Sequence, residues 1–452
     1  MQNSSWVAPG ANRRLWMVRL LRSAAAAFAV TAVACAAQAQ TQTQTQTQSQ
    51  TQTQQSPQIP AAAQQPLSLK QAVDAAWARQ PETRSLSQRR NAAAAQAQAA
   101  RRWTPEPFAL DLSIKTDRLS SNNGARDLVA GVSAPLWLPG ERDRNVALAN
   151  AEQGALDGRL AAAQWRTAGA VREAWWAAHV ARIDVSMAQS RLASAQQLAA
   201  DVARRVAAGD LARADQHQAD AAVAAMQADV ALTAAAQMQA LQALRGLLGI
   251  KAGEVLALQN PVGENEPAGP VDALLAAHPG LRELVDKAEV ARRAHDLALV
   301  QKRANPEVAV QTSRDRGAFG EAYGQSISIG VRFPFGANDR QLAKAALAGA
   351  ERTEAETVLA NERERLAAEA QAAAARVLGA RGVVSATEQR AALARDSRGF
   401  FDKAFRLGQA DLPTRLRIEL EAAEAERQLA RARIELFHAI SALRQTLGLM
   451  PE

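Results

Sequence analysis

The stretch LVAGVSAPLWLPGERDR, residues 128–144, decides the fold. Its first half alternates between an apolar set of side chains and a second, mixed set, which is the period of a β-strand. Pro139-Gly140 ends the strand, because proline donates no hydrogen bond to a sheet ladder. A long proline-free pattern begins at Glu141. The stretch therefore predicts a strand that leads directly into a very long helix.

The same transition recurs in the second half of the chain. A strand pattern covers residues 323–335, and Asp339-Arg340 then repeats the earlier Asp143-Arg144 pair. A second long proline-free stretch follows, and Gly408 marks a turn in the place that Gly209 takes in the first half. The sequence thus predicts a tandem duplication of helix, β-hairpin, long helix, turn and helix.

This order predicts a mainly α fold with some β structure, and it sets the boundaries of the segments. We expect a signal peptide at 1–39, a disordered Gln/Thr-rich leader at 40–66, a first structural repeat at 67–250, an inter-repeat loop at 251–270 and a second repeat at 271–452. The four strands are predicted at about 107–117, 127–138, 307–314 and 323–335. Helices are predicted at 67–103 and 271–304, each interrupted at a proline, and at 141–206, 211–248, 339–405 and 412–447.

The N-terminal segment has the pattern of a cleaved secretory signal. Four arginines in the first 22 residues precede an apolar run too short to span a bilayer, and Ala37-Gln38-Ala39 fits a signal-peptidase site. Cys35 is the only cysteine, so no internal disulfide can form. A second interpretation, in which Cys35 is lipidated, stays open. Both interpretations predict an exported protein.

Composition excludes some function classes. The chain is 48% hydrophobic but only 4% aromatic, which suits close helix-on-helix packing by alanine better than a large globular core. Its net charge is +8, and the four signal arginines account for half of it. The remaining charges are interspersed, so the sequence does not indicate nucleic-acid binding.

Reaction chemistry is not indicated either. The sequence contains no phosphate-binding glycine loop, G-x-S-x-G, H-E-x-x-H or C-x-x-C pattern. Its five histidines are far apart, at His179, His217, His278, His295 and His438. We therefore expect no enzyme, cofactor or resident metal. His217 lies near three aspartates, which leaves open a transient cation contact beside the simpler reading of a solvated helix face.

The strand pattern itself suggests a membrane. Outer-membrane barrel strands alternate apolar and polar side chains over about 10 residues. We expect Asp111 and Ser328 to face a lumen and the following side chains to face lipid: Phe108, Leu110, Leu112, Ile114, Ile327, Ile329 and Val331. One chain cannot close such a barrel, because an open edge would leave backbone groups unpaired in lipid. Several copies are therefore required, unless the hairpins belong to a soluble sheet packed on the helices.

This order of elements resembles the TolC family of trimeric outer-membrane efflux channels. The resemblance rests on the helix start at Leu67-Ser68-Leu69, the strand-to-helix junctions, and the turns near Gly209 and Gly408, and it covers residue 67 onward. It implies a homotrimer with a 12-stranded outer-membrane β-barrel, continued by a periplasmic α-helical barrel. It also implies a periplasmic adaptor protein and an inner-membrane resistance–nodulation–division (RND) pump as partners, in a Gram-negative cell.

The helix turns resemble the adaptor-docking tips of that family. The first turn fits the family's R-x3-G-x5-D pattern with Arg205, Gly209 and Asp215. The second turn fits only in part, with Arg406, Gly408, Asp411 and Leu412, because Thr414 stands where the pattern has aspartate. Ordinary turn and capping chemistry is the alternative for these residues. Charged residues near both turns are candidates for a periplasmic gate: Asp201, Arg204, Asp210, Asp402 and Lys403.

The sequence therefore predicts a passive exit duct of a tripartite efflux pump. The simple GANDR junction at 336–340 is most similar to outer-membrane components of cobalt-zinc-cadmium type heavy-metal pumps, which implies metal cations as cargo. Two alternatives stay open. One is an exported coiled-coil scaffold or adaptor that spans no membrane, and the other is a TolC-like channel for drugs or secreted protein.

Overall fold

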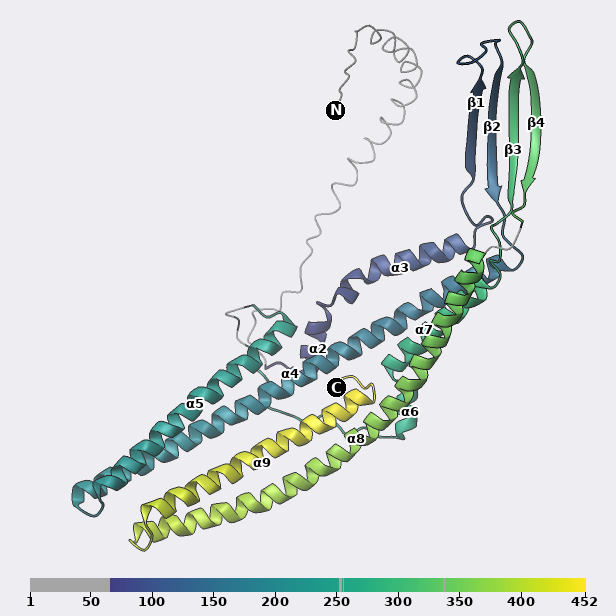
Figure 1. The fold of residues 1–452 in the computed structure, drawn as a ribbon. Coiled ribbons are helices and arrows are strands. Elements are labelled where there is room, and N and C mark those ends of the chain that lie inside the picture. The colour runs from purple at the N-terminus through teal and green to yellow at the C-terminus, as the bar shows by residue number, and fades with distance from the viewer. Residues whose placement is uncertain (1–65, 252–253, 255, 336–338) are drawn as a thin grey trace, which may run out of the picture. The chain divides into compact units, whose positions relative to one another are not determined.

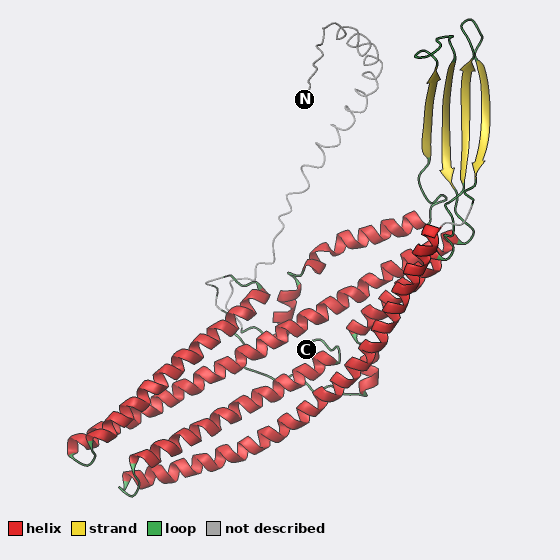
Figure 2. Cartoon of the chain, viewed as in Figure 1, coloured by secondary structure: helices red, strands yellow, loops and turns green. Residues whose placement is uncertain are grey.

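The computed structural model describes residues 66–251, 254, 256–335 and 339–452. The predicted signal peptide, with Cys35, and the leader up to Gln65 lie outside the described residues. The described chain is mainly helical and carries one small antiparallel sheet, which confirms the predicted fold class at this level (Figure 2).

The same series of elements occurs twice along the chain. The first half contains α2 (Leu69–Trp77), α3 (Pro81–Ala100), β1 (Ala109–Thr116), β2 (Arg126–Pro135), α4 (Glu141–Ala208) and α5 (Arg213–Leu248). The second half contains α6 (Val271–Ala276), α7 (Pro279–Ala298), β3 (Glu307–Arg316), β4 (Gly324–Arg332), α8 (Asp339–Arg406) and α9 (Leu412–Thr446). The strands form one sheet in the order β1-β2-β3-β4, so each half contributes one hairpin.

The long helices separate the sheet from the helical turns. Helices α4 and α8 have 68 residues each, which corresponds to about 100 Å of helix. Each pairs with the shorter helix that follows it, and the two hairpins run side by side (Figure 1). Within the described residues from 66 to 452, the sheet lies at one end of these helices and both hairpin turns lie at the other (Figure 1).

Local sequence signals explain where several helices begin. Ser68 and Gln71 form a reciprocal capping box at the start of α2, and Pro81 occupies the first turn of α3. At the start of α7, the His278 side chain accepts hydrogen bonds from the backbone N–H groups of Gly280 and Leu281. The starts of α3 and α7 lie at the prolines that interrupt the predicted helical segments, Pro81 and Pro279.

Two helical segments end earlier than the sequence predicts: α3 ends at Ala100 instead of Trp103, and α7 is shortened more. The pattern predicts helix over 271–304, but α7 ends at Ala298. The side chains of Gln301 and Asn305 instead donate hydrogen bonds to the buried carboxylate of Glu141, at 2.8 and 2.9 Å. These hydrogen bonds stabilise the chain more than a further turn of helix would, because a buried carboxylate without hydrogen-bond partners costs free energy.

The apolar core is distributed along the helices as separate clusters. The largest surrounds Trp175 and Trp176 of α4 and joins this helix to α2, α5 and α9. A second joins α6, α8 and α9 around Leu366, and a third lies at the hairpin turns. Of the helices that the structure describes, none is both long enough and apolar enough to cross a membrane.

Candidate functional site

The register of the sheet gathers the apolar strand residues on one face. Residues directly opposite one another in an antiparallel pair share a face. One continuous row across the four strands contains Leu110, Val132, Val310 and Ile329. The next row contains Leu112, Ala130, Thr312 and Ile327. The sheet therefore has an apolar face that runs over both hairpins.

This face is uncovered in the single chain. Leu112 is 71% exposed and Ile329 is 75% exposed, although both are large aliphatic side chains. The remaining residues predicted to face lipid are exposed to a similar degree: Phe108, Leu110, Ile114, Ile327 and Val331. The opposite face carries a polar row made of Asp111, Gly131, Gln311 and Ser328.

Glycines reverse the chain at the two helical turns. Gly209 and Gly408 have φ values of 87° and 73°, in the left-handed region that a side chain disfavours. Both amides donate to carbonyls of the last helical turn, as in a common helix C-terminus. Each turn is therefore a compact cap that points away from the sheet.

An aromatic side chain joins the two turns. Phe405 of α8 is only 2% exposed and packs in a cluster with Leu198 and Val202 of α4, Ala219 of α5 and Leu412 of α9. We call this set the tip cluster. It holds the end of the α4–α5 hairpin against the end of the α8–α9 hairpin.

Two guanidinium groups cover the Phe405 ring. The Cζ atoms of Arg205 and Arg415 lie 4.6 and 4.7 Å from the ring centroid. Arg205 also donates a hydrogen bond to the Phe405 carbonyl at 3.2 Å. Arg415 in turn pairs with Asp402 at 2.6 Å. The link between the hairpins is thus apolar and cation–π in character.

The predicted gate residues pair mainly within their own hairpins. Arg204 pairs with Asp201 of the same helix, and Asp402 pairs with Arg406 and Arg415. In the described chain, Asp210 and Lys403 take part in no ion pair, and no ion pair joins the two hairpins at the turns. Within the described part of one chain, Asp210 and Lys403 are therefore the two gate residues available for an ion pair with a neighbouring molecule.

The predicted docking residues include several that stabilise the turns. The carboxylate of Asp215 accepts a hydrogen bond from the Ala212 amide at 3.0 Å, and Asp411 is the N-cap residue of α9. A hydrogen bond from the Thr414 hydroxyl lowers the pKa of the Asp411 carboxyl. Thr414 thus supports the second turn although it departs from the pattern of the first.

An apolar groove lies between the hairpins next to the tip cluster. It has a volume of about 570 Å³ and receives side chains from α4, α5, α8 and α9. Its floor is apolar, and Arg191, Arg398 and Glu426 are among the charged residues that line it. The groove could accept apolar side chains of another helix.

A buried ion cluster holds the inter-repeat loop to both halves. Glu264 of this loop pairs with Arg172 of α4 at 2.8 Å and with Arg444 of α9 at 3.3 Å, and all three side chains are less than a tenth exposed. Ser441 also donates to Glu264. We call Arg172, Glu264 and Arg444 the central ion cluster. It fixes the loop and the C-terminal residues against α4.

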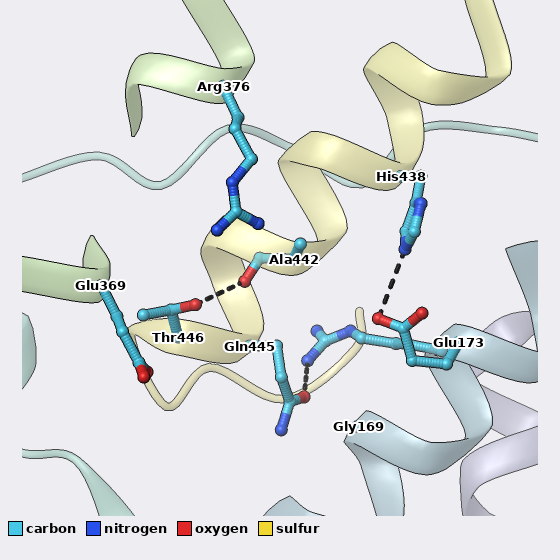
Figure 3. A pocket seen from close by; sticks show the side chains of 9 residues that line it. Gly169, Glu173, Glu369, Arg376, His438, Ala442, Gln445 and Thr446 are labelled. Carbon is cyan, nitrogen blue, oxygen red and sulfur yellow. Dashed lines mark hydrogen bonds and ion pairs between the residues drawn. The ribbon is translucent and has the colours of Figure 1, made fainter. Parts of the chain in front are cut away.

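A small cavity of about 250 Å³ lies beside the central ion cluster (Figure 3). Its polar groups are largely engaged with one another. Gln445 accepts from Arg172 at 2.5 Å, and His438 lies 3.3 Å from the carboxylate of Glu173. The cavity is thus better explained as part of a structural joint than as a reaction site.

Sequence reasoning missed the central ion cluster and the role of Phe405. The matching ends of the two halves, LRGLLG at 244–249 and LRQTLG at 443–448, contained the first signal. Arg245 and Arg444 occupy the same place in these ends, and both donate to carbonyls of the segment that follows. For Phe405, the only signal was an aromatic residue three positions before the turn glycine, and its partners on α4 and α5 are distant in sequence.

The histidines do not gather into a metal site. Within the part of the chain that the structure describes, no group of three or more His, Cys, Asp or Glu side chains could hold an ion. His217 is exposed on α5. Burial, with a smaller contribution from Arg182, lowers the pKa of His179 to about 4, so this side chain is neutral at physiological pH.

Comparison with protein families gives one match. Residues 72–250, about two-fifths of the chain, match the family described as outer membrane efflux protein. A search of curated proteins found no match to the chain.

Solved structures share the fold. The outer membrane protein VceC from Vibrio cholerae is 18% identical, with a TM-score of 0.68 over 85% of this chain and 97% of that one. The open state of the MtrE outer membrane channel from Neisseria gonorrhoeae is 18% identical, with a TM-score of 0.69 over 84% and 89%. CusC, described in terms of folding and transmembrane channel formation, is 16% identical, with a TM-score of 0.70 over 84% and 92%.

Proposed function

We propose that this protein is the outer-membrane exit duct of a tripartite efflux pump in a Gram-negative cell. Three copies form a 12-stranded barrel that continues into a periplasmic tunnel of helices. Substrate passes through without chemical change, from an inner-membrane RND pump and a periplasmic adaptor to the exterior. The match of residues 72–250 to the outer membrane efflux protein family and the shared fold of solved outer membrane channels support this proposal.

The observation that carries the proposal is the uncovered apolar face of a sheet with two open edges. Strands β1 and β4 are the edges of this sheet. In water, such a face and such edges would favour aggregation. In lipid, the face is solvated by hydrocarbon, and pairing of β4 with β1 of the next copy removes both edges. A scaffold without a membrane has no use for this face.

The long helices also offer a surface to a neighbouring copy. Several apolar side chains of α8 are largely uncovered by the rest of the chain, with exposures between 54% and 68%: Leu378, Val383, Leu393 and Phe400. Leu393 and Phe400 are seven residues apart, which is the spacing of a helix-packing seam, and Leu407 follows at the same spacing in the turn after α8. This seam supports side-by-side assembly of the helices into a tunnel.

The helical turns form the adaptor-docking and gating end in this proposal. The docking surface consists of the turn residues Arg205, Gly209, Asp215, Arg406, Gly408, Asp411 and Leu412. The adjacent groove between the hairpins adds apolar area for a partner helix. Asp201, Arg204, Asp210, Asp402 and Lys403 narrow the mouth, where exposed charge pairs worth about 0–1 kcal/mol each can be displaced by the adaptor.

For the cargo, we propose heavy-metal cations, on the resemblance of the GANDR junction to metal-pump components. A duct must release what it carries, so the duct needs no strong metal site. The test is purified protein in planar bilayers, with conductance measured in zinc, cobalt and potassium salts. Channels that conduct divalent cations are expected. A soluble monomer without conductance would overturn the duct, and conducting channels that exclude these metals would overturn only the cargo.

A further inference from the structure

The apolar face of the sheet ends in arginines at the strand turns. The row beyond Leu112 contains Ile114, Leu128, Arg314 and Gln325. The last row contains Thr116, Arg126 and Arg316. Because opposed residues share a face, three guanidinium-bearing side chains extend the lipid-facing surface beyond its apolar rows.

An aromatic ring holds two of these arginines. The Cζ atoms of Arg314 and Arg316 lie 4.8 and 5.0 Å from the ring centroid of Tyr323. Arg316 also donates a hydrogen bond from Nε to the carbonyl of Gly124 in the other turn, at 3.0 Å. These contacts order the side chains before any ligand arrives, which lowers the entropy lost on binding.

The acids of the sheet do not neutralise this cluster. Asp127 and Asp315 are opposed to each other in the row between the two arginine rows, so they lie on the other face. Among the described residues of the sheet, the ion pair between Arg332 and Glu307 lies at the helix end, and none involves Arg126, Arg314 or Arg316.

The acids in the turns are occupied by their own backbone. The carboxylate of Asp117 accepts from the Asn123 amide at 2.6 Å. The carboxylate of Glu321 accepts from the amides of Gly317 and Ala318 at 2.8 and 3.0 Å. The arginine cluster therefore presents uncompensated positive charge on one face.

The position of the cluster identifies the kind of anion. The apolar rows from Phe108 to Ile114 span about 20 Å along the strand, which is comparable to the apolar band of outer-membrane barrels. The arginines follow this band at the start of β2 and the end of β3. Figure 1 shows that these strand ends lie away from the helices. An anion at this depth is a lipid headgroup, and guanidinium groups bind phosphate with two parallel hydrogen bonds.

We infer that Arg126, Arg314 and Arg316 form a binding site for the phosphate-bearing headgroup of an outer-leaflet lipid. This inference rests on the proposed membrane-embedded duct. The site anchors the outer rim of the barrel, with Tyr323 packed against two of the guanidinium groups.

The test uses native mass spectrometry of the purified full chain in detergent, titrated with diphosphorylated lipid A. The variant is Arg126→Ala with Arg314→Ala, which leaves the Arg316 contact between the turns intact. The matched control is Lys115→Ala, because Lys115 shares the row of Asp127 on the opposite face. We expect the double variant to bind the lipid at least about tenfold more weakly, and the control to bind like the wild type.

Further measurements distinguish binding of a lipid headgroup from binding of free phosphate. They also distinguish a failure of the lipid site from a failure of the proposed duct. Dephosphorylated lipid A is expected to bind all proteins weakly, and millimolar inorganic phosphate is expected not to displace the lipid. Displacement by inorganic phosphate, or equal lipid binding by the wild type and the double variant, would overturn the lipid site. Conductance and particle mass should be unchanged in the double variant. A wild type that forms no channel would instead overturn the proposed duct.

Discussion

Truncating Phe405 should open the tunnel mouth, because this ring is the main link between the two helical turns. The Phe405→Ala change removes a side chain that is 2% exposed from the tip cluster. Such truncations cost about 3–5 kcal/mol in protein cores. It also removes the ring from between Arg205 and Arg415, where each cation–π contact is worth about 0.5–2 kcal/mol.

Only part of this loss of free energy destabilises the closed state of the tunnel mouth relative to the open state. Phe405 shares the tip cluster with Leu412 of its own hairpin as well as with Leu198 and Val202 of the other hairpin. The hydrogen bond from Arg205 to the Phe405 carbonyl survives the substitution. About 3 kcal/mol lost by the closed state alone would raise the open-to-closed ratio on the order of 100-fold.

Single-channel conductance in planar bilayers and hydrogen exchange at residues 198–219 measure this change. We expect a larger open fraction and faster exchange for Phe405→Ala. Leu232→Ala is the matched control, because Leu232 lies on α5 outside the tip cluster and is 71% exposed. Equal conductance and equal exchange in the two variants would refute the tip cluster as the link that keeps the mouth closed.

Three further changes test other parts of the molecule. Ile329→Arg should reduce membrane assembly more than Ser328→Arg, because an arginine that faces lipid at mid-membrane costs about 2–4 kcal/mol. The yield of heat-resistant oligomer measures this difference, and the reverse order would mean that the lipid face is misassigned. Glu264→Gln should lower stability to denaturant by about 3–5 kcal/mol, because it leaves buried arginine charge uncompensated. Burial lowers the pKa of His179 to about 4, whereas this side chain has its ordinary pKa of 6.5 in the unfolded protein. The contribution of neutral His179 to the free energy of unfolding should therefore be fully present above pH 6.5 and fall by about 3 kcal/mol as the pH drops from 6.5 to 4. His179→Phe should remove this fall and the exposed His217→Gln should keep it.

The sequence was sufficient for the order of elements but not for their contacts. The sequence reveals local signals, because these depend on residues close together in the chain. Such signals are the alternation with a period of two, the long proline-free stretches and the two turn glycines. The end of α7 was mispredicted because Gln301, inside the predicted helix, instead donates a hydrogen bond to Glu141, which lies in the other half of the chain.

The same distinction applies to the candidate site. The predicted turn residues do lie at the turns, since a glycine with positive φ is a local signal. The partner of Arg205 could not be read from the sequence, because Phe405 lies 200 residues away. The arginines at the outer rim emerged only from the register, which aligns Arg126 with Arg316 across the two halves.

The central claim is that β4 of one copy pairs with β1 of the next to close a barrel from three chains. Cysteine cross-linking in membranes tests it most directly, in a Cys35→Ser background that has no other cysteine. Cysteine replaces Leu112 on β1 and, one at a time, Ile327, Ile329 or Val331 on β4. The account predicts that at least one pair gives bands of two and three chains and none larger. Bands that stop at one chain in every pair, or that continue beyond three, would contradict it.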